Sequence, residues 1–205
     1  MATLDWDHPS ASQFITAKYG SNLDPDQNKF NLSMWMNSDS VHTGCPKFSL
    51  LCEQMLHNGS PGILFRDRYE EGNPLPHQPY VSTPPCAEMA MSDDGDGCHF
   101  VAVNLAGHLM KDGTGIDISA LRRSSAIALR FADDAVDVSL SRTWSKGVYD
   151  KRRVSINICG VADLLVKMNL PYDSHEAREV IEDAFAIVNI ATKLESVKLA
   201  SERGR

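Results

Sequence analysis

Short apolar segments typical of β-strands alternate along the whole chain with longer segments that have the apolar spacing of amphipathic helices. Strands are expected at residues 3–6, 30–36, 63–65, 100–105 and 154–158. Because helical segments separate these runs, the order predicts an α/β fold. A chain of 205 residues is long enough to bury a substantial core, and we expect a single domain over residues 1–205.

Three helical segments show a clear apolar face. In the first, which begins at Pro46, the expected buried face includes Cys52 and consists of Phe48, Leu51, Cys52, Met55 and Leu56. In the second, residues 119–136, the apolar stripe consists of Leu121, Ala128, Leu129, Ala132 and Val136. For the last helix we expect Asp173 as N-cap with Glu176 as its capping-box partner, and a buried face of Ala177, Val180, Ile181, Ala184, Val188, Ala191 and Leu194.

The pattern stops between residues 66 and 97, where five prolines precede an acidic run. Irregular segments of about thirty residues are uncommon inside compact domains, and they tend to be functional loops or disordered. The middle of this segment, around Tyr80 and residues 86–91, is too apolar for a disordered linker. We therefore expect an ordered functional loop.

Composition limits the partners and the compartment. The net charge of −7 disfavours binding to polymeric nucleic acid, although local groups could still bind a single nucleotide. No apolar run approaches the roughly 20 residues of a membrane span, and no signal peptide is visible, so we expect no membrane association and a cytoplasmic location. The five scattered cysteines predict free thiols rather than a disulfide framework or a zinc site.

Seven segments in sequence order resemble the catalytic subunit of ribonucleotide reductase, most closely its cobalamin-dependent class II branch. They are Asp7-His8-Pro9, Asn31-Leu32-Ser33, Gly59 to Arg68, Thr83-Pro84-Pro85-Cys86-Ala87-Glu88, Gly97-Cys98 to Ala106, Gly160 to Leu165, and Leu170-Pro171-Tyr172-Asp173-Ser174. Together they cover almost the whole chain, which makes the resemblance specific even though each segment alone is weak.

The resemblance implies a site. In that family a finger loop inside a ten-stranded α/β barrel carries a cysteine whose thiyl radical abstracts the 3′ hydrogen of a ribonucleotide. By motif match Cys86 is that cysteine, Glu88 is the general base for the 3′-hydroxyl, and Cys98 is one of the reducing thiols. A carboxylate two residues from a thiol points the same way in an extended loop. We expect both groups to lie in a pocket that excludes bulk solvent.

The chain also departs from the family pattern. Pro84 stands where the family has asparagine, Ala87 replaces a glycine, and His99 replaces an asparagine. The segment with the partner of the reducing thiol and the later strands are not recognisable. About five strands with flanking helices would form a partial, half-barrel fold. Because open sheet edges are usually covered, we expect a homodimer or a complementary barrel fragment to complete it.

Two functions remain open. The first is a ribonucleotide-reductase-like oxidoreductase that uses thiyl radical chemistry on the ribose of a nucleotide or nucleoside, either as a diverged biosynthetic enzyme or as one part of a split reductase. The second is a catalytically inactive, nucleotide-binding or protein-interaction relative; a fragment of a disrupted gene would have no function. The cofactor is open: the resemblance implies adenosylcobalamin, but no binding segment is recognisable.

Three further features have alternative interpretations. Arg122-Arg123 or Lys151-Arg152-Arg153 could hold a phosphate, although solvent-facing side chains are the simpler interpretation. Asp93, Asp94 and Asp96 could bind a hard cation, but a solvated turn is favoured, so we expect no metal site. Cys86 and Cys98 could themselves form a disulfide.

Overall fold

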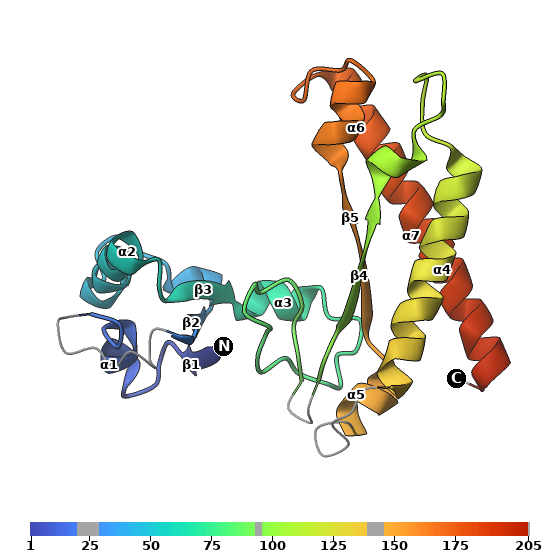
Figure 1. Cartoon of the computed structure of the whole chain (residues 1–205). Helices are drawn as coiled ribbons and strands as arrows, with labels where there is room; N and C mark the ends of the chain where they lie inside the picture. Colours follow the sequence, from blue (N-terminus) through green and yellow to red (C-terminus); the bar gives the residue numbers. More distant parts are fainter. Residues whose placement is uncertain (20–28, 93–95, 139–145, 205) are drawn as a thin grey trace. The chain divides into compact units, whose positions relative to one another are not determined.

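The computed structural model describes residues 1–19, 29–92, 96–138 and 146–204, and its elements are shown in Figure 1. The chain divides into two compact units, Met1–Asp94 and Gly95–Arg205, and each is described by itself. The boundary falls within residues 66–97, the segment expected to be irregular, although its first six residues form the helix α3 (Arg66–Glu71). The single domain over residues 1–205 stays a prediction.

Unit 1 is built on a three-stranded parallel sheet. Its elements are β1 (Ala2–Asp5), α1 (Ala11–Ile15), β2 (Leu32–Met36), the 3-10 helix η2 (Ser38–Ser40), α2 (Pro46–Asn58), β3 (Gly62–Phe65) and α3 (Arg66–Glu71). The strand order is β1-β2-β3, with Asp5 opposite Trp35 and Trp35 opposite Leu64. The central strand is therefore flanked on both sides by parallel neighbours.

The two faces of β2 have different roles. Met34 and Met36 pack into a core with residues of β1, α1 and α2, whereas Trp35 points to the other face because side chains alternate along a strand. Residues Ser33 to Met36 are all buried. The alternating pattern of this segment suggested a half-buried strand, but a central strand is covered on both faces.

Unit 2 combines a two-stranded parallel sheet with long helices. Its elements are β4 (His99–Asn104), the 3-10 helix η3 (Leu105–His108), α4 (Ile118–Asp137), α5 (Lys146–Lys151), β5 (Val154–Cys159), α6 (Val161–Lys167) and α7 (His175–Arg203). β4 pairs with β5 from His99 opposite Val154 to Asn104 opposite Cys159. α4 packs against both β4 and α7 (Figure 1).

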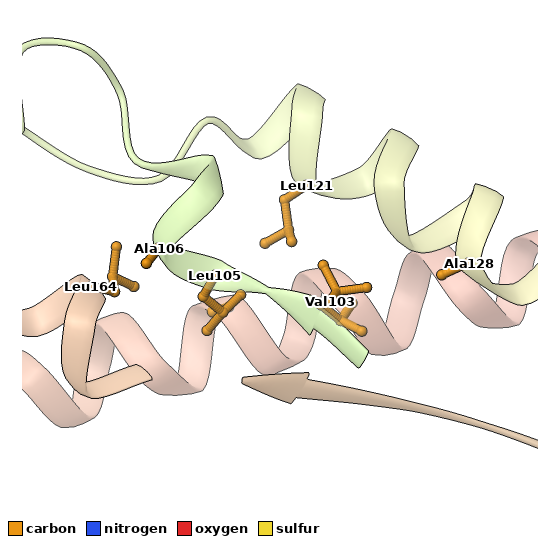
Figure 2. Close-up of a cluster of buried hydrophobic side chains, with 8 residues drawn as sticks. Val103, Leu105, Ala106, Leu121, Ala128 and Leu164 are labelled. Atoms are coloured by element: carbon orange, nitrogen blue, oxygen red, sulfur yellow. The ribbon is translucent and has the colours of Figure 1, made fainter. Parts of the chain in front are cut away.

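Side chains from β4, η3, α4, α6 and α7 form the core of unit 2. Figure 2 shows Leu121 and Ala128 of α4 over Val103 and Leu105, with Leu164 of α6 at the end of the cluster. Leu105, Leu121 and Leu164 are fully buried. All five members of the predicted α4 stripe are buried, so that prediction is confirmed.

These observations confirm the α/β class, with five strands in the described residues and parallel pairing between the neighbouring strands of each sheet. The strands form two sheets, and the described residues do not close a barrel. Within the described residues no helix is long and apolar enough to cross a membrane.

Two details of the helices correct the sequence-based expectations. In α2 the core side is Leu51 with Gln54, while Cys52 is exposed and Leu56 is 87% exposed, so Cys52 is not a core residue. The apolar set was wide enough to fit two orientations of the helix, and the sheet selects the side centred on Leu51.

In α7 the N-cap is Ser174 and not Asp173, because the Ser174 hydroxyl accepts the Ala177 amide at 3.1 Å. The buried face of α7 extends to Leu199, whereas Leu194 is 67% exposed.

Burial predicts different responses to the same substitution in unit 2. Leu121→Ala removes a fully buried side chain and should lower the free energy of unfolding by about 2–5 kcal/mol. Leu194→Ala changes an exposed position of α7 and should alter it by less than about 0.5 kcal/mol. Denaturant unfolding of the full chain measures both, and equal losses would contradict the packing described here.

Candidate active site

A closed loop presents the predicted site residues of unit 1. An antiparallel bridge joins Ser82 to Met91, with Met91 N donating to Ser82 O at 2.8 Å and Val81 N donating to Met91 O at 2.8 Å. We call residues 82–91 the reactive loop. Cys86 and Glu88 lie in the middle of this loop.

A tight turn sets the backbone at Cys86. The Ala87 amide donates to Pro84 O at 2.9 Å, which places Pro85 and Cys86 at the two central positions of a β-turn. Pro85 suits the first of these positions because its ring fixes φ. Pro84 serves as an acceptor only, and the Thr83 hydroxyl also donates to its carbonyl at 3.0 Å.

Ala87 adopts a left-handed backbone with φ of 62°. This region disfavours residues with a Cβ and favours glycine, the residue that the family motif has at this position. The loop is therefore not extended between Cys86 and Glu88. The argument that strand-like alternation points both side chains the same way is wrong for this geometry.

Residues of β2 and α3 hold the reactive loop and the residues just before it. The Tyr69 hydroxyl donates to Ala87 O at 2.6 Å, and Trp35 Nε1 donates to Val81 O at 3.1 Å. The Asn31 side-chain amide donates to Pro85 O at 3.1 Å. Each bond spans many residues of sequence, so the loop position depends on the sheet.

A second set of contacts fixes Tyr80, two residues before the reactive loop. Glu70 Oε1 accepts the Tyr80 amide at 2.8 Å, and Arg66 Nη1 donates to Tyr80 O at 3.3 Å. The Arg66 guanidinium also lies 5.0 Å from the centre of the Trp35 ring and pairs with Asp5. Since both backbone groups of Tyr80 are bonded, the entry to the loop is rigidly defined.

Burial and a nearby charge both act on the phenol of Tyr69. Partial burial raises its pKa, and the negative charge of Glu88 raises it further. Glu88 is therefore close enough to Tyr69 for its charge to act on the phenol. Cys86 and Glu88 themselves are exposed.

Cys98 belongs to unit 2, directly before β4. It is half-buried, and its thiol lies 3.9 Å from the carbonyl oxygen of His99. Two residues earlier, the fully buried carboxylate of Asp96 pairs with Lys151 at 3.4 Å and with Arg153 at 3.3 Å. These ion pairs tie the start of β4 to the start of β5. Pairing of Cys98 with Cys86, which lies in the other unit, stays a prediction.

Lys151, Arg152 and Arg153 do not simply face solvent. Lys151 and Arg153 bind Asp96, and Arg152 joins α5 to α4 through Asp133 and Asp137, both at 2.7 Å. The second oxygen of Asp133 pairs with Arg203 at the end of α7. Because carboxylates already bind these cations, they do not form a ready phosphate site. Arg122 and Arg123 are exposed.

The proposed cation site gains no support. Asp93 and Asp94 lie outside the described residues, and the Asp96 carboxylate forms ion pairs with the side chains of Lys151 and Arg153. Among the residues that the structure describes, no three His, Cys, Asp or Glu side chains are placed to share a metal ion. All five cysteines are free thiols.

Sequence reasoning did not identify the residues that hold the loop, namely Trp35, Arg66, Tyr69 and Glu70. Their contacts join positions 10 to 46 residues apart and leave no periodic signal. The available signal was local: an aromatic and charged segment, Arg66 to Glu71, directly follows a buried strand.

Comparison with known proteins confirms the family resemblance. Residues 48–205 match the family "Ribonucleotide reductase, barrel domain". The chain belongs to this family, and the matched residues include Cys86, Glu88 and Cys98.

Full-length relatives place the match within larger proteins. The chain is 29% identical over its whole length to the vitamin B12-dependent ribonucleoside-diphosphate reductase of Mycobacterium tuberculosis, of which it covers 32%. It is 28% identical, again over its whole length, to the protein of the same name from Thermoplasma acidophilum, of which it covers 29%. It matches a ribonucleoside-diphosphate reductase subunit alpha of Chlamydia pneumoniae at 25% identity over 75% of the chain, or 15% of that relative. The chain thus spans about a third of the first two relatives.

The charge network of unit 2 predicts a pH effect. The hydrogen bonds with Arg152 hold the pKa of Asp137 below its ordinary value, so its contribution to stability is complete above about pH 4 and is lost as the pH falls through the lowered pKa. Asp137→Asn should lower the free energy of unfolding at pH 7 by up to about 1 kcal/mol and flatten its decline below pH 4.

The matched control is Asp183→Asn. Asp183 is exposed on α7, and within the described residues it forms no ion pair. This substitution should leave the pH profile of the unfolding free energy unchanged. Unfolding curves between pH 2 and pH 7 measure the effect. If Asp137→Asn lowered the unfolding free energy equally at every pH, the pH dependence would not come from the Asp137–Arg152 pair.

Proposed function

We propose that this chain acts as a ribonucleotide-reductase-like oxidoreductase on the ribose of a nucleotide or nucleoside, with Cys86 as the radical cysteine. The observation that supports this most is the anchored turn that presents Cys86 and Glu88 together in a member of the ribonucleotide reductase family. The names of the relatives suggest a ribonucleoside diphosphate as substrate. The chain would work as a diverged biosynthetic enzyme or as one part of a split reductase.

The proposed first step is a hydrogen-atom transfer. The sulfur radical of Cys86 takes the 3′ hydrogen, so an S–H bond forms as the C3′–H bond breaks and the unpaired electron moves to C3′. The Glu88 carboxylate accepts the proton of the 3′-hydroxyl as general base. The 2′-hydroxyl leaves as water, and the two electrons that replace it come from the Cys98 thiol and one thiol of an added dithiol, which end as a mixed disulfide. Cys86 then gives its hydrogen back to C3′ and becomes the sulfur radical again. The second thiol of the dithiol displaces Cys98 from the mixed disulfide, which returns Cys98 as a thiol and leaves the oxidised dithiol.

The radical must come from a source that the described residues do not hold. Cys86 is exposed, and a cavity of about 470 Å³ is lined by residues of unit 2, among them Leu129, Val154 and Leu199. The described residues therefore do not enclose a corrin ring beside Cys86. We propose that a partner encloses the loop and brings the radical source.

The exposure of Cys86 and Glu88 favours a second candidate, an inactive relative that binds a nucleotide or another protein. Pro84 agrees with it, because proline offers no amide hydrogen to a substrate hydroxyl. This candidate shares the fold and the binding of a nucleotide with the first, and differs in that no deoxyribonucleotide is formed.

A turnover assay separates the two candidates. The full chain is incubated with ribonucleoside mono-, di- and triphosphates, adenosylcobalamin as radical source and dithiothreitol as reductant, and nucleotide binding is measured by calorimetry in parallel. The reductase predicts a deoxyribonucleotide product that Cys86→Ala abolishes and that Glu88→Gln slows by at least about 100-fold.

Cys52→Ala serves as the control, because Cys52 is an exposed thiol of α2 outside the loop, and it should leave turnover unchanged. Binding without product would refute a reductase that this chain forms by itself and would favour the inactive, nucleotide-binding relative. Neither binding nor product would refute both nucleotide reduction and nucleotide binding by this chain alone.

Self-association is the simplest source of the proposed enclosure. We expect the chain to form a dimer at micromolar concentration, because half of a barrel leaves strand edges that proteins usually pair or cover. Light scattering after size exclusion measures the mass. A well-folded monomer would refute the homodimer and leave a complementary barrel fragment as the required partner.

A further inference from the structure

Two peptide groups separate Cys86 from Glu88, and a separate hydrogen bond holds each. The peptide between Cys86 and Ala87 donates its N–H to Pro84 O at 2.9 Å. The peptide between Ala87 and Glu88 accepts from the Tyr69 hydroxyl at 2.6 Å. The first bond is local to the turn, whereas the second comes from α3, outside the reactive loop.

Ala87 lies between these two peptides in the disfavoured left-handed region, with φ of 62°. A residue with a Cβ keeps that conformation only where its surroundings impose it. The Tyr69 bond acts on the carbonyl of Ala87 itself, so it opposes relaxation of this residue. Without that bond Ala87 would relax towards the backbone conformations that alanine prefers, and the direction of Glu88 relative to Cys86 would change.

The Tyr69 phenol is itself held in place. Its ring lies edge-on to Trp35, with ring centres 5.3 Å apart and an interplanar angle of 80°. Trp35 is only 2% exposed, sits in the central strand β2 and donates to Val81 O. The hydroxyl position is thus fixed by the sheet and not by the loop it binds.

Tyr69 and Glu88 also interact through charge. The Glu88 carboxylate disfavours the phenolate, which is the second cause of the raised pKa of Tyr69 after burial. This effect requires the carboxylate to stay near the phenol, in agreement with a fixed Glu88 direction.

We propose that Tyr69 is the positioning residue of the Cys86–Glu88 pair: its hydrogen bond to Ala87 O fixes the direction of the Glu88 carboxylate relative to the thiol. The role rests on the proposed function in that these two side chains are the reacting groups. Tyr69 acts through the backbone of Ala87 and needs no contact with substrate.

The test uses thiol chemistry and requires no turnover. Iodoacetate and iodoacetamide alkylate cysteine by the same displacement, but only iodoacetate carries a negative charge that a nearby carboxylate repels. Peptide mass spectrometry of the full chain follows Cys86 and, in the same sample, the exposed Cys52 as an internal reference. The ratio of the two rates at Cys86 reports the charge beside the thiol, independently of its overall accessibility.

In Glu88→Gln we expect the iodoacetate to iodoacetamide ratio at Cys86 to rise about threefold. Tyr69→Phe, which keeps the ring and removes the hydroxyl, should raise it at least half as far. The double variant should match Glu88→Gln alone, because both changes remove the same interaction. Tyr172→Phe, at an exposed position of unit 2, should leave the ratio unchanged.

A merely structural role for Tyr69 gives a different result. General loosening would accelerate both reagents equally and leave their ratio at the wild-type value, and that outcome overturns the proposal. A second measurement guards against an unfolded variant. The absorbance titration of Tyr69→Phe is subtracted from that of the wild type, and the difference reports the Tyr69 phenol alone. Glu88→Gln should lower the pKa of this phenol. An unchanged titration would also overturn the proposal. Neither readout depends on nucleotide reduction, so failure of the proposed function remains distinguishable.

Discussion

The geometry of the reactive loop depends on the hydrogen bond from the Tyr69 hydroxyl to the carbonyl of Ala87. A turn alone defines where Cys86 lies, but it does not define a left-handed alanine or the direction of the next side chain. The aromatic contact with Trp35 gives this bond a rigid origin. An exposed loop thereby gains a fixed backbone without a hydrophobic core of its own.

Unit 2 is stabilised in a different way. A long apolar stripe on α4 packs against β4 and α7, and ion pairs of Asp96, Asp133 and Arg152 connect the ends of the elements. These partly buried pairs cost desolvation, which the fitted hydrogen-bond geometry offsets. Cys98 lies two residues beyond Asp96, so its backbone belongs to this charge-linked end of the sheet.

The sequence predicted those features that leave a periodic pattern or a contiguous motif. The α4 stripe was predictable because one narrow face of twenty residues is apolar, and the family emerged from ordered motifs. The orientation of α2 was not predictable. Leu51 and Cys52 are neighbours on a broad apolar face, and only packing against the sheet buries Leu51 and leaves Cys52 exposed. The anchors of the loop were not predictable either, because a bond from Tyr69 to Ala87 joins segments through the fold alone.

The position of Trp35 in the central strand links the reactive loop to the pairing of the sheet. Neighbouring residues of a strand face opposite sides, so a slip of β2 by one residue would exchange Trp35 with a methionine. Thioether side chains offer no N–H to the carbonyl of Val81 and no ring edge to Tyr69. The position of the Cys86 thiol therefore depends on the register of β2. A reactive loop transplanted without β2 would lose the hydrogen bond from Trp35 to Val81 O and the ring contact between Trp35 and Tyr69.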